Sequence, residues 1–393
     1  MNSDLSWLIL STIFLFFGIV LTYWIHNQQF IQILISQAAP PTSSTAPLIS
    51  IIVPARNEAR NIRRCLEALA VQTYPNLELI VVDDRSTDNT LDIIEEAAAH
   101  HKDQACPAVK IIPGAVLPPG WTGKPHALFQ GVSAAQGEWL CFIDADTYAH
   151  PSLVSSTFQA AQSLSADLLT ILTDQQLGSF WEKVIMPLVF TALSVGFPAD
   201  RVNDPGKPDA IANGQFILIR KSVYEIVGGH QAVRAEIAED KALAALVKGK
   251  GFHLVLGDGR ALAQTRMYTS LSEIWEGWTK NIYLGLQDRL WLLAAGALAG
   301  LVGALALPLW TVLSLIWAAS GCSWMAYLAA AESLCVWGYL LYQRVSACRA
   351  MQINLWYALS LPLGALIFTL MMLTSAYRVL SGKGVTWRGR SYS

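Results

Sequence analysis

Four stretches of this 393-residue chain are apolar enough to cross a bilayer, for which about 20 residues are needed. They cover residues 5–25, 291–318, 325–342 and 355–377. Charged residues make up 14% of the chain and hydrophobic residues 53%, whereas a typical soluble domain has about 25% charged residues. The sequence therefore predicts an integral membrane protein with one globular domain between its apolar ends.

The first apolar stretch is preceded by Asp4 and by no basic residue, and no small-residue cleavage site follows it. Signal peptides begin with a positive region, so a retained anchor is expected in place of a cleaved signal. Within 291–318, Pro308 is expected to kink the helix. The predicted parts are an anchor at 1–27, a linker at 28–47, an α/β domain at 48–270, an amphipathic helix at 271–289, three spans at 290–378 and a basic tail at 379–393.

The basic residues near the apolar segments bear on membrane topology. A short loop predicted to hold Arg344 and Arg349 should be cytoplasmic, together with the globular domain, because cytoplasmic loops are enriched in Lys and Arg. Three C-terminal crossings would then place the tail that begins near Arg378 on the opposite side, against the same rule. Either one apolar segment is re-entrant or the tail departs from the trend.

Charge and cysteine content narrow the choice of partners. The chain has 27 Lys and Arg against 29 Asp and Glu, so its charge gives no reason to expect a nucleic-acid partner, and protein partners are left unknown. Its six cysteines show no C-x-x-C spacing. Neither a zinc site nor a disulfide framework is predicted.

The globular part alternates short apolar strands with helical segments. Residues 49–53, 79–82 and 139–143 have strand character, and 61–71 and 90–100 have helical spacing. This alternation predicts an α/β domain with a largely parallel sheet, in which ligands bind beyond the carboxyl ends of the strands.

Polar residues follow the first two of these strands. Pro54, Arg56 and Glu58 lie in a turn between strand and helix, which can present side chains and N–H groups to a nucleotide. Asp83 and Asp84 directly end the second strand, where a carboxylate can accept hydrogen bonds from a base or ribose. Nearby Ser86 and Asp88 have the simpler interpretation of helix caps.

The third strand runs into Asp144 and Asp146, whose spacing can place both carboxylates on one side. Mg²⁺ or Mn²⁺ prefers such oxygen ligands together with substrate phosphates. Upstream, Lys124 lies between turn residues and is either a phosphate contact or a solvated loop lysine.

Asp240 lies at the start of a predicted helix, where it either favours the helix dipole or acts as a base that removes a proton from an acceptor hydroxyl. No Ser or Cys is placed like an activated nucleophile, and His126 and His230 have no evident partner, so one-step displacement is favoured over a covalent intermediate.

Two features concern the membrane region. Trp275, Trp278 and Ile282 recur at helical spacing and form either a packed core face or an interfacial helix that guides a lipid acceptor. Glu332 lies within an apolar segment, where it either lines an acceptor path or is protonated and packed between helices.

The order of these motifs resembles family 2 glycosyltransferases over about residues 48–287. The resemblance implies an α/β GT-A domain, Rossmann-like and of the nucleotide-diphospho-sugar transferase type, with transmembrane helices at both ends. It also implies a nucleotide-sugar donor (usually UDP-linked), a divalent Mg²⁺ or Mn²⁺, and inversion at the anomeric carbon. Carried over by motif, the donor site would comprise Pro54, Arg56, Glu58, Asp83, Asp84, Lys124 and Asp144, with Asp146 as metal ligand and Asp240 as base.

Within the family, residues 120–124, 265–268, 273–281 and 387–390 look most like bacterial enzymes that glycosylate carotenoids. They are also similar to hopanoid-associated and ceramide-type enzymes. Each of these resemblances implies a lipid acceptor and, for a bacterial enzyme, a location at the inner membrane. Many processive and ceramide-type members carry Q/R-x-x-R-W, whereas 275–278 reads Trp-Glu-Gly-Trp and the nearest approach is 287–291. This departure argues against a polysaccharide synthase and against ceramide as acceptor. A non-catalytic membrane scaffold would not need the acidic clusters, all of which are present.

Overall fold

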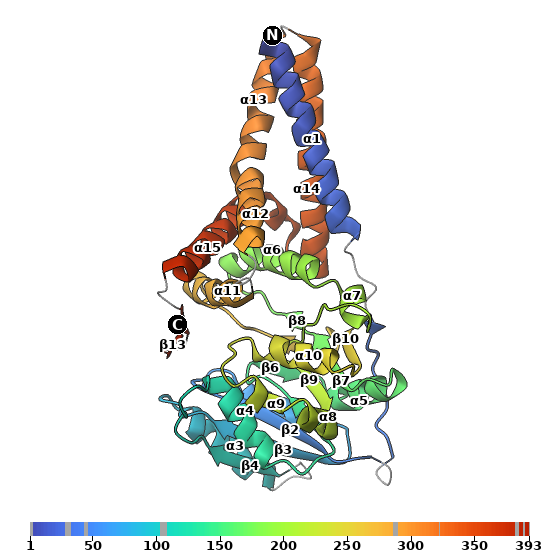
Figure 1. The fold of residues 1–393 in the computed structure, drawn as a ribbon, viewed down its shortest axis with the longest axis vertical. Coiled ribbons are helices and arrows are strands. Elements are labelled where there is room, and N and C mark those ends of the chain that lie inside the picture. The colour runs from blue at the N-terminus through green and yellow to red at the C-terminus, as the bar shows by residue number, and fades with distance from the viewer. Residues whose placement is uncertain are drawn as a thin grey trace. The chain divides into compact units, whose positions relative to one another are not determined.

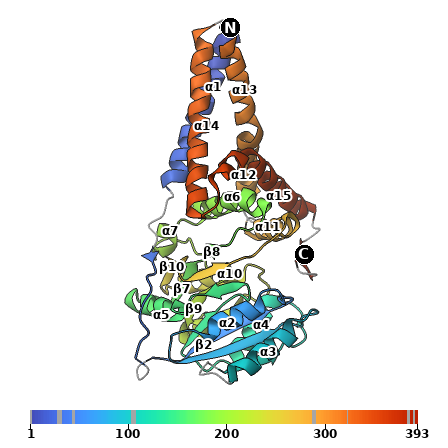
Figure 2. The same cartoon turned by 180° about the vertical axis from the view of Figure 1, so that it is seen from behind.

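The computed structural model describes residues 3–27, 33–42, 46–102, 108–285, 290–321, 323–381, 385–387 and 390–392. The chain forms two compact units (Figures 1 and 2). The α/β domain comprises Phe30–Gln176 and Phe197–Met267, and the apolar helices belong to Met1–Gln29, Leu177–Gly196 and Tyr268–Ser393, here called the helical unit.

The α/β domain is built on an eight-stranded sheet in the order β1-β10-β7-β9-β5-β2-β3-β4. Only β9, among the described pairings of this sheet, runs antiparallel to its neighbours, so the predicted largely parallel sheet is confirmed. The strands are β1 (Ile33–Leu34), β2 (Ile49–Ala55), β3 (Leu77–Asp83), β4 (Val109–Pro113), β5 (Trp139–Phe142), β7 (Leu168–Leu172), β9 (Ile217–Arg220) and β10 (Leu254–Asp258). A smaller sheet joins β6 (Thr147–Ala149), β11 (Ala263–Thr265) and β8 (Asp174–Gln175).

Helices cover both faces of the large sheet because β2 is apolar on both sides. Ile51 and Val53 pack in one buried cluster with α2, and Ile52 packs in the other with α4 and α10. This two-sided burial is typical of parallel strands covered by helices. The helices of the domain are α2 (Ile62–Ala70), α3 (Thr90–Lys102), α4 (Gly123–Ser133), α5 (Leu153–Ser163), α7 (Ala199–Asn203), α8 (Lys221–Ile226), α9 (Gly229–Ala232) and α10 (Glu239–Gly249).

The predicted linker at 28–47 is in part a strand. Ile33 and Leu34 pair in parallel with β10, and the side chain of Ile35 is buried. Ile35 is buried and Ile33 partly buried against the core of the domain, whereas Leu34 is exposed, so the linker prediction was wrong for residues 33–35. Residues 28–32 and 43–45 lie outside the described part.

The helical unit contains the three predicted C-terminal apolar helices. Three stretches are long and apolar enough to cross a membrane, namely Leu293–Ala319, Trp324–Ala350 and Leu355–Arg378, and α1 contains the shorter apolar run Leu5–Val20. The helices are α1 (Ser3–Asn27), α6 (Phe180–Gly196), α11 (Leu271–Gly285), α12 (Leu290–Leu301), η1 (Val302–Ala306), α13 (Leu307–Ala319), α14 (Trp324–Ala350), η2 (Leu355–Ser360) and α15 (Leu361–Ser381). The π-helical η1 ends two residues before Pro308, so the helix is irregular close to the predicted kink.

Helix α6 belongs to the helical unit although it lies inside the predicted domain at 48–270. Pro187 is internal to α6 and has no N–H to donate to the carbonyl of Lys183 four residues earlier. Arg344 of α14 supplies the missing donor, since its Nη2 lies 3.0 Å from the Lys183 oxygen and 2.7 Å from that of Val184. The loop prediction for Arg344 was therefore wrong: α14 continues to Ala350, and the arginine is buried because it bonds to these carbonyls.

Glu332 of α14 packs against α1. Ser11 donates a hydrogen bond of 2.5 Å to one carboxyl oxygen and Thr12 one of 3.1 Å to the other. These bonds satisfy the buried carboxyl group, so the packing alternative is favoured over an acceptor path.

Three predicted features fall outside the described residues. They are the nearest approach to Q/R-x-x-R-W at 287–289 and the tail residues Lys383 and Arg388. The described parts of the tail are the paired strands β12 (Val385–Trp387) and β13 (Arg390–Tyr392).

Gly131 lets α4 pack closely on the sheet, and this contact yields the first prediction. A Cβ there would lie 2.5 Å from Cγ2 of Ile52, whose side chain is fully buried and has no space to move. Gly131→Ala should therefore lower the free energy of unfolding by about 1–3 kcal/mol. Thermal unfolding of the purified protein measures this.

Gly249→Ala in α10 is the control, because a Cβ at Gly249 meets nothing within 4 Å. The alanine should be neutral or stabilise by up to about 1 kcal/mol. Equal melting temperatures for the two variants would contradict the close contact.

Candidate active site

Three neighbouring strands deliver the polar residues to one edge of the sheet. β2 lies between β3 and β5, and all three run parallel. Their carboxyl ends therefore lie side by side, and the chain beyond them carries the Pro54–Glu58 turn, the Asp83–Asp84 pair and the Asp144–Asp146 pair. The three segments therefore share one edge of the sheet.

Arg56 joins the first two segments. Its Nη1 donates to the carbonyl oxygen of Asp84 at 2.7 Å, and the N–H of Asp84 donates to the carbonyl of Ala55 at 2.7 Å. Asn57 and Arg85 adopt left-handed backbone angles, with φ of 54° and 58°. The Asn57 side chain accepts from the N–H of Thr87 at 2.8 Å, so the two turns hold each other in place.

Asp83 offers a free acceptor at this edge. The residue is buried, and its Oδ2 accepts a weak hydrogen bond of 3.3 Å from the N–H of Ser86. Its Oδ1 is buried and has no hydrogen-bond partner within the described part of the chain. A buried carboxylate oxygen costs free energy unless a donor reaches it, and a ribose hydroxyl or a base N–H is such a donor.

Glu58 is also buried, and its surroundings fix its position. Its N–H donates to Thr90 Oγ1 at 2.8 Å, and its Oε2 accepts from Asn61 Nδ2 at 2.9 Å. Pro54 is the last-but-one residue of β2 and pairs with Val82 of β3. Both residues thus lie at the strand ends where the nucleoside was predicted.

Lys124 forms the electrostatic centre of the site. It is the second residue of α4, and its Nζ lies 2.7 Å from Asp144 Oδ1 and 2.9 Å from Glu239 Oε1. Burial favours the neutral amine, but the charges of Asp144, Glu239 and Asp240 outweigh it and raise the pKa of Lys124 well above its usual value. The lysine therefore stays charged, and its ion pairs at the start of α4 differ from the alternative of a solvated loop lysine, whereas the phosphate contact stays a prediction.

Glu239 was not among the predicted site residues. Burial would raise the pKa of its carboxyl, but the contact with Lys124 outweighs burial and lowers it. The sequence signal was its position beside Asp240, although nothing in the pattern indicated that Lys124 would be its partner.

Asp240 begins α10 with Glu239. Its Oδ2 accepts from the N–H of Gly214 at 2.9 Å and its Oδ1 from the N–H of Lys241 at 2.7 Å. Burial and the neighbouring charge of Glu239 raise the pKa of Asp240 to about 6, despite the opposing charge of Lys124. A carboxylate with such a pKa is half protonated near pH 6 and can accept a proton at neutral pH.

Asp144 and Asp146 differ in their surroundings. Burial raises the pKa of Asp144 in spite of the ion pair with Lys124, whereas the side chain of Asp146 is partly exposed. The described residues contain no cluster of three or more His, Cys, Asp or Glu side chains suited to hold a metal ion. The carboxylates of Asp144 and Asp146 fit a Mg²⁺-like ion, which is bound by one or two carboxylates and has substrate phosphates as its other ligands.

The two histidines have structural partners. Nδ1 of buried His230 lies 2.9 Å from the hydroxyl of Tyr224, and burial lowers the pKa of His230 to about 4. Nδ1 of His126 lies 3.2 Å from Gln130 Nε2. These contacts are with Tyr224 and Gln130, and the one-step displacement stays a prediction.

Trp275 and Trp278 belong to the helical unit and not to the α/β domain. Trp278 and Ile282 lie on the buried face of α11, which packs against α15, and Trp275 is partly exposed.

Residues 50–227 match the model of glycosyl transferase family 2. In fold, the chain is similar to the mannosyltransferase PcManGT from Pyrobaculum calidifontis, solved in complex with GDP-Man and Mn²⁺, with a TM-score of 0.54 at 17% identity over 96% of this chain and 99% of that one. The fold and the strand-edge site define a glycosyltransferase of GT-A type. More narrowly, its residues 50–227 match family 2 of the glycosyltransferases, and the chain resembles carotenoid glycosyltransferases.

Two curated relatives carry that resemblance. The 4,4'-diaponeurosporenoate glycosyltransferase of Staphylococcus aureus strain MRSA252 is 28% identical over 271 residues, which are 68% of this chain and 69% of the relative. The counterpart of strain USA300 is 29% identical over 241 residues, or 60% of this chain and 61% of the relative.

Gly214 is a site residue that the sequence did not reveal. A Cβ there would lie 2.9 Å from Lys124 Nζ, 3.1 Å from Asp240 Oδ2 and 3.6 Å from Asp144 Oδ2. We expect Gly214→Ala to displace these groups and to lower kcat/KM roughly 10- to 100-fold. Initial rates of sugar transfer at matched protein concentration measure the effect.

Gly249→Ala, at the other end of α10, is the matched control and should keep full activity. Circular dichroism shows whether both variants retain the fold. Full activity of Gly214→Ala would mean that the close approach of these three side chains is unimportant.

Proposed function

We propose that this enzyme transfers a sugar, with inversion, from a nucleotide-sugar to a hydroxyl of a hydrophobic lipid, a carotenoid or another isoprenoid. The observation that carries the proposal is the position of Asp240. Its carboxylate lies close to the Lys124–Asp144 ion pair at the strand edge, and its pKa is raised. The motif resemblance favours a UDP-linked donor. The spanning-length apolar helices and the similarity to carotenoid glycosyltransferases support a lipid acceptor.

The donor residues take their roles from their positions. Asp83, with its unpartnered oxygen, and Asp84 would receive donors from the nucleoside, and Arg56 holds the turn that carries them. Lys124 and Asp144 would contact the diphosphate-sugar portion. Pro54 and Glu58 would complete the wall of the nucleoside site.

In the reaction, Asp240 accepts the proton of the acceptor hydroxyl while the oxygen of that hydroxyl forms a bond to the anomeric carbon. The bond between that carbon and the diphosphate oxygen breaks, and the diphosphate leaves with the electron pair. Mg²⁺ or Mn²⁺ at Asp146 would offset the charge that builds on the leaving diphosphate. Lys124 adds a fixed positive charge at the same edge.

Trp275 and Trp278 are proposed to serve the lipid side of the reaction. Partly exposed Trp275 would contact the acceptor at the bilayer surface, and buried Trp278 would hold α11 in place. The positive-inside rule, applied to exposed Arg349 at the end of α14, favours a cytoplasmic α/β domain, in a bacterial cell at the inner membrane.

The pH dependence tests the base. Because Asp240 must be deprotonated to act, kcat/KM should fall about tenfold for each pH unit below about 6. Asp240→Asn should lower kcat by about 10²–10⁴ and remove this pH limb. An Asp240→Asn variant as active as the parent would show that another group is the base.

The metal is tested by chelation and by Asp146→Ala. EDTA should abolish transfer, Mg²⁺ or Mn²⁺ should restore it, and Asp146→Ala should be inactive at any metal concentration tested. Glu95→Ala on the exposed side of α3 serves as a control that removes a remote carboxylate. Parental activity that persists in excess EDTA would overturn the metal dependence.

Mass spectrometry of lipids tests the acceptor. Cells that express the active chain should contain a lipid heavier by one hexose or deoxyhexose than its counterpart in cells with Asp240→Asn. A glycosylated carotenoid or isoprenoid would support the proposal. A glycosylated ceramide or hopanoid, or a long polysaccharide, would favour one of the alternatives.

A further inference from the structure

The direction of the first helices defines the two ends of the helical unit. α1 and α14 run the same way, since Ser11 bonds to Glu332 and, further along both helices, Gly18 packs on Val336. α13 runs the opposite way, because only residues 320–323 separate it from α14. One end, the turn end, holds 320–323, and the other, the arginine end, holds Arg344 and the last turns of α1 and α14.

Helix α15 starts near the arginine end. Arg344 binds the carbonyl of Val184 in α6, and a Cβ on Gly364 of α15 would lie 2.6 Å from that same oxygen. The beginning of α15 therefore meets α6 at the level of Arg344, far from the turn at 320–323.

Helix α15 then runs away from the turn end. Gly300 lies against Thr369 and Gly296 against Met372, so α15 is antiparallel to α12. Since α12 leads through η1 and α13 toward the turn end, α15 leads in the reverse direction. Figures 1 and 2 show α15 oblique to α13 and α14 in both views. Beyond α15, strand β12 lies against α11.

We infer that residues 355–381 do not cross the membrane and instead lie within the leaflet at the arginine end, with lipid acyl chains as their partner. From Leu359 onward, the exposed large apolar residues of this segment are spaced by three, four or seven and form one stripe along the helix. The stripe consists of Leu359, Leu363, Leu370, Leu373, Tyr377 and Leu380. The opposite face packs on α6, α11 and α12.

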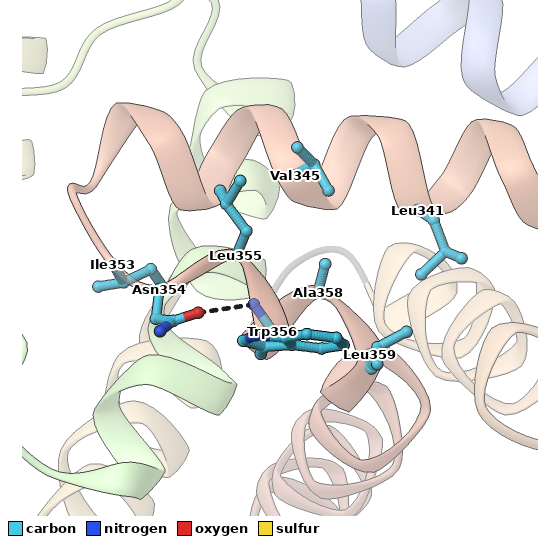
Figure 3. A pocket seen from close by; sticks show the side chains of 8 residues that line it. All are labelled: Leu341, Val345, Ile353, Asn354, Leu355, Trp356, Ala358 and Leu359. Carbon is cyan, nitrogen blue, oxygen red and sulfur yellow. Dashed lines mark hydrogen bonds between the residues drawn. The ribbon is translucent and has the colours of Figure 1, made fainter.

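The pocket at the corner between α14 and η2 fits this placement. It has a volume of about 700 Å³ and is lined mostly by apolar side chains from the end of α14 and from η2 (Figure 3). Trp356 lines it and is 77% exposed. An exposed tryptophan beside an apolar pocket suits the boundary between lipid headgroups and acyl chains.

Charge agrees with a single-leaflet segment. Arg349 ends α14 and Arg378 lies in the last turn of α15, and the two fall on the same side when α15 does not cross. The described turn residues Ser320, Gly321 and Ser323 carry no charge, and the beginning of α1 at the same end has Asp4 and no Lys or Arg. The asymmetry of basic residues is then the one that the positive-inside rule describes.

Cysteine labelling in sealed membrane vesicles tests the inference. Ser320→Cys, Ala350→Cys and Ser381→Cys each add one exposed thiol, at the turn end, at the end of α14 and at the end of α15, to the native cysteines. A membrane-impermeant maleimide is added to right-side-out and to inverted vesicles, with the unsubstituted chain as background. Labelling after detergent treatment sets the full signal for each thiol.

We expect Ser381→Cys to label from the same face as Ala350→Cys and from the opposite face to Ser320→Cys. Labelling of Ser381→Cys from the face of Ser320→Cys would overturn the inference, because α15 would then cross. The measurement does not depend on sugar transfer. If Ala350→Cys and Ser381→Cys both label from outside, the leaflet placement stands and the cytoplasmic location proposed above is wrong.

Discussion

The active site depends on the positive charge of Lys124. Asp144, Glu239 and Asp240 come from two segments that are distant in sequence, and their carboxylates would repel one another at the sheet edge without a cation between them. Lys124 binds the first two directly, so it joins the chain after β5 to the start of α10. Asp240 accepts from two backbone N–H groups, and burial together with the charge of Glu239 raises its pKa to about 6 against the opposing charge of Lys124, so this carboxylate can exchange a proton near neutral pH.

The sequence predicted which segments would meet but not how their side chains would pair. Parallel strands share an edge, so the residues after β2, β3 and β5 had to converge, and the pairing confirms it. The partners of Lys124 depend on where α4 and α10 pack, which no local pattern contains. Gly214 is the clearest case, because its need for a small residue arises from side chains contributed by three other segments.

In the helical unit, hydropathy identified the long apolar helices but gave no information on the hydrogen bonds between them. α6 has 17 residues and an internal proline, so it falls short of a membrane span and was assigned to the α/β domain. Arg344 was expected in a loop because it lies between the apolar stretches 325–342 and 355–377. α6 and Arg344 are connected in the structure. Pro187 leaves a carbonyl of α6 without a helical donor, and Arg344 provides that donor.

The conflict between the number of predicted spans and the basic tail arises only if every long apolar helix crosses the membrane. Length and hydropathy show that a helix is able to cross a membrane, whereas packing against neighbouring helices determines its direction. The small residues Gly296, Gly300 and Gly364 allow α15 to pack closely against α12 and α6, antiparallel to the first and beside the carbonyl that Arg344 binds. With that packing, three helices, α1, the α12–α13 segment and α14, suffice to cross, and Arg349 and Arg378 fall on one side.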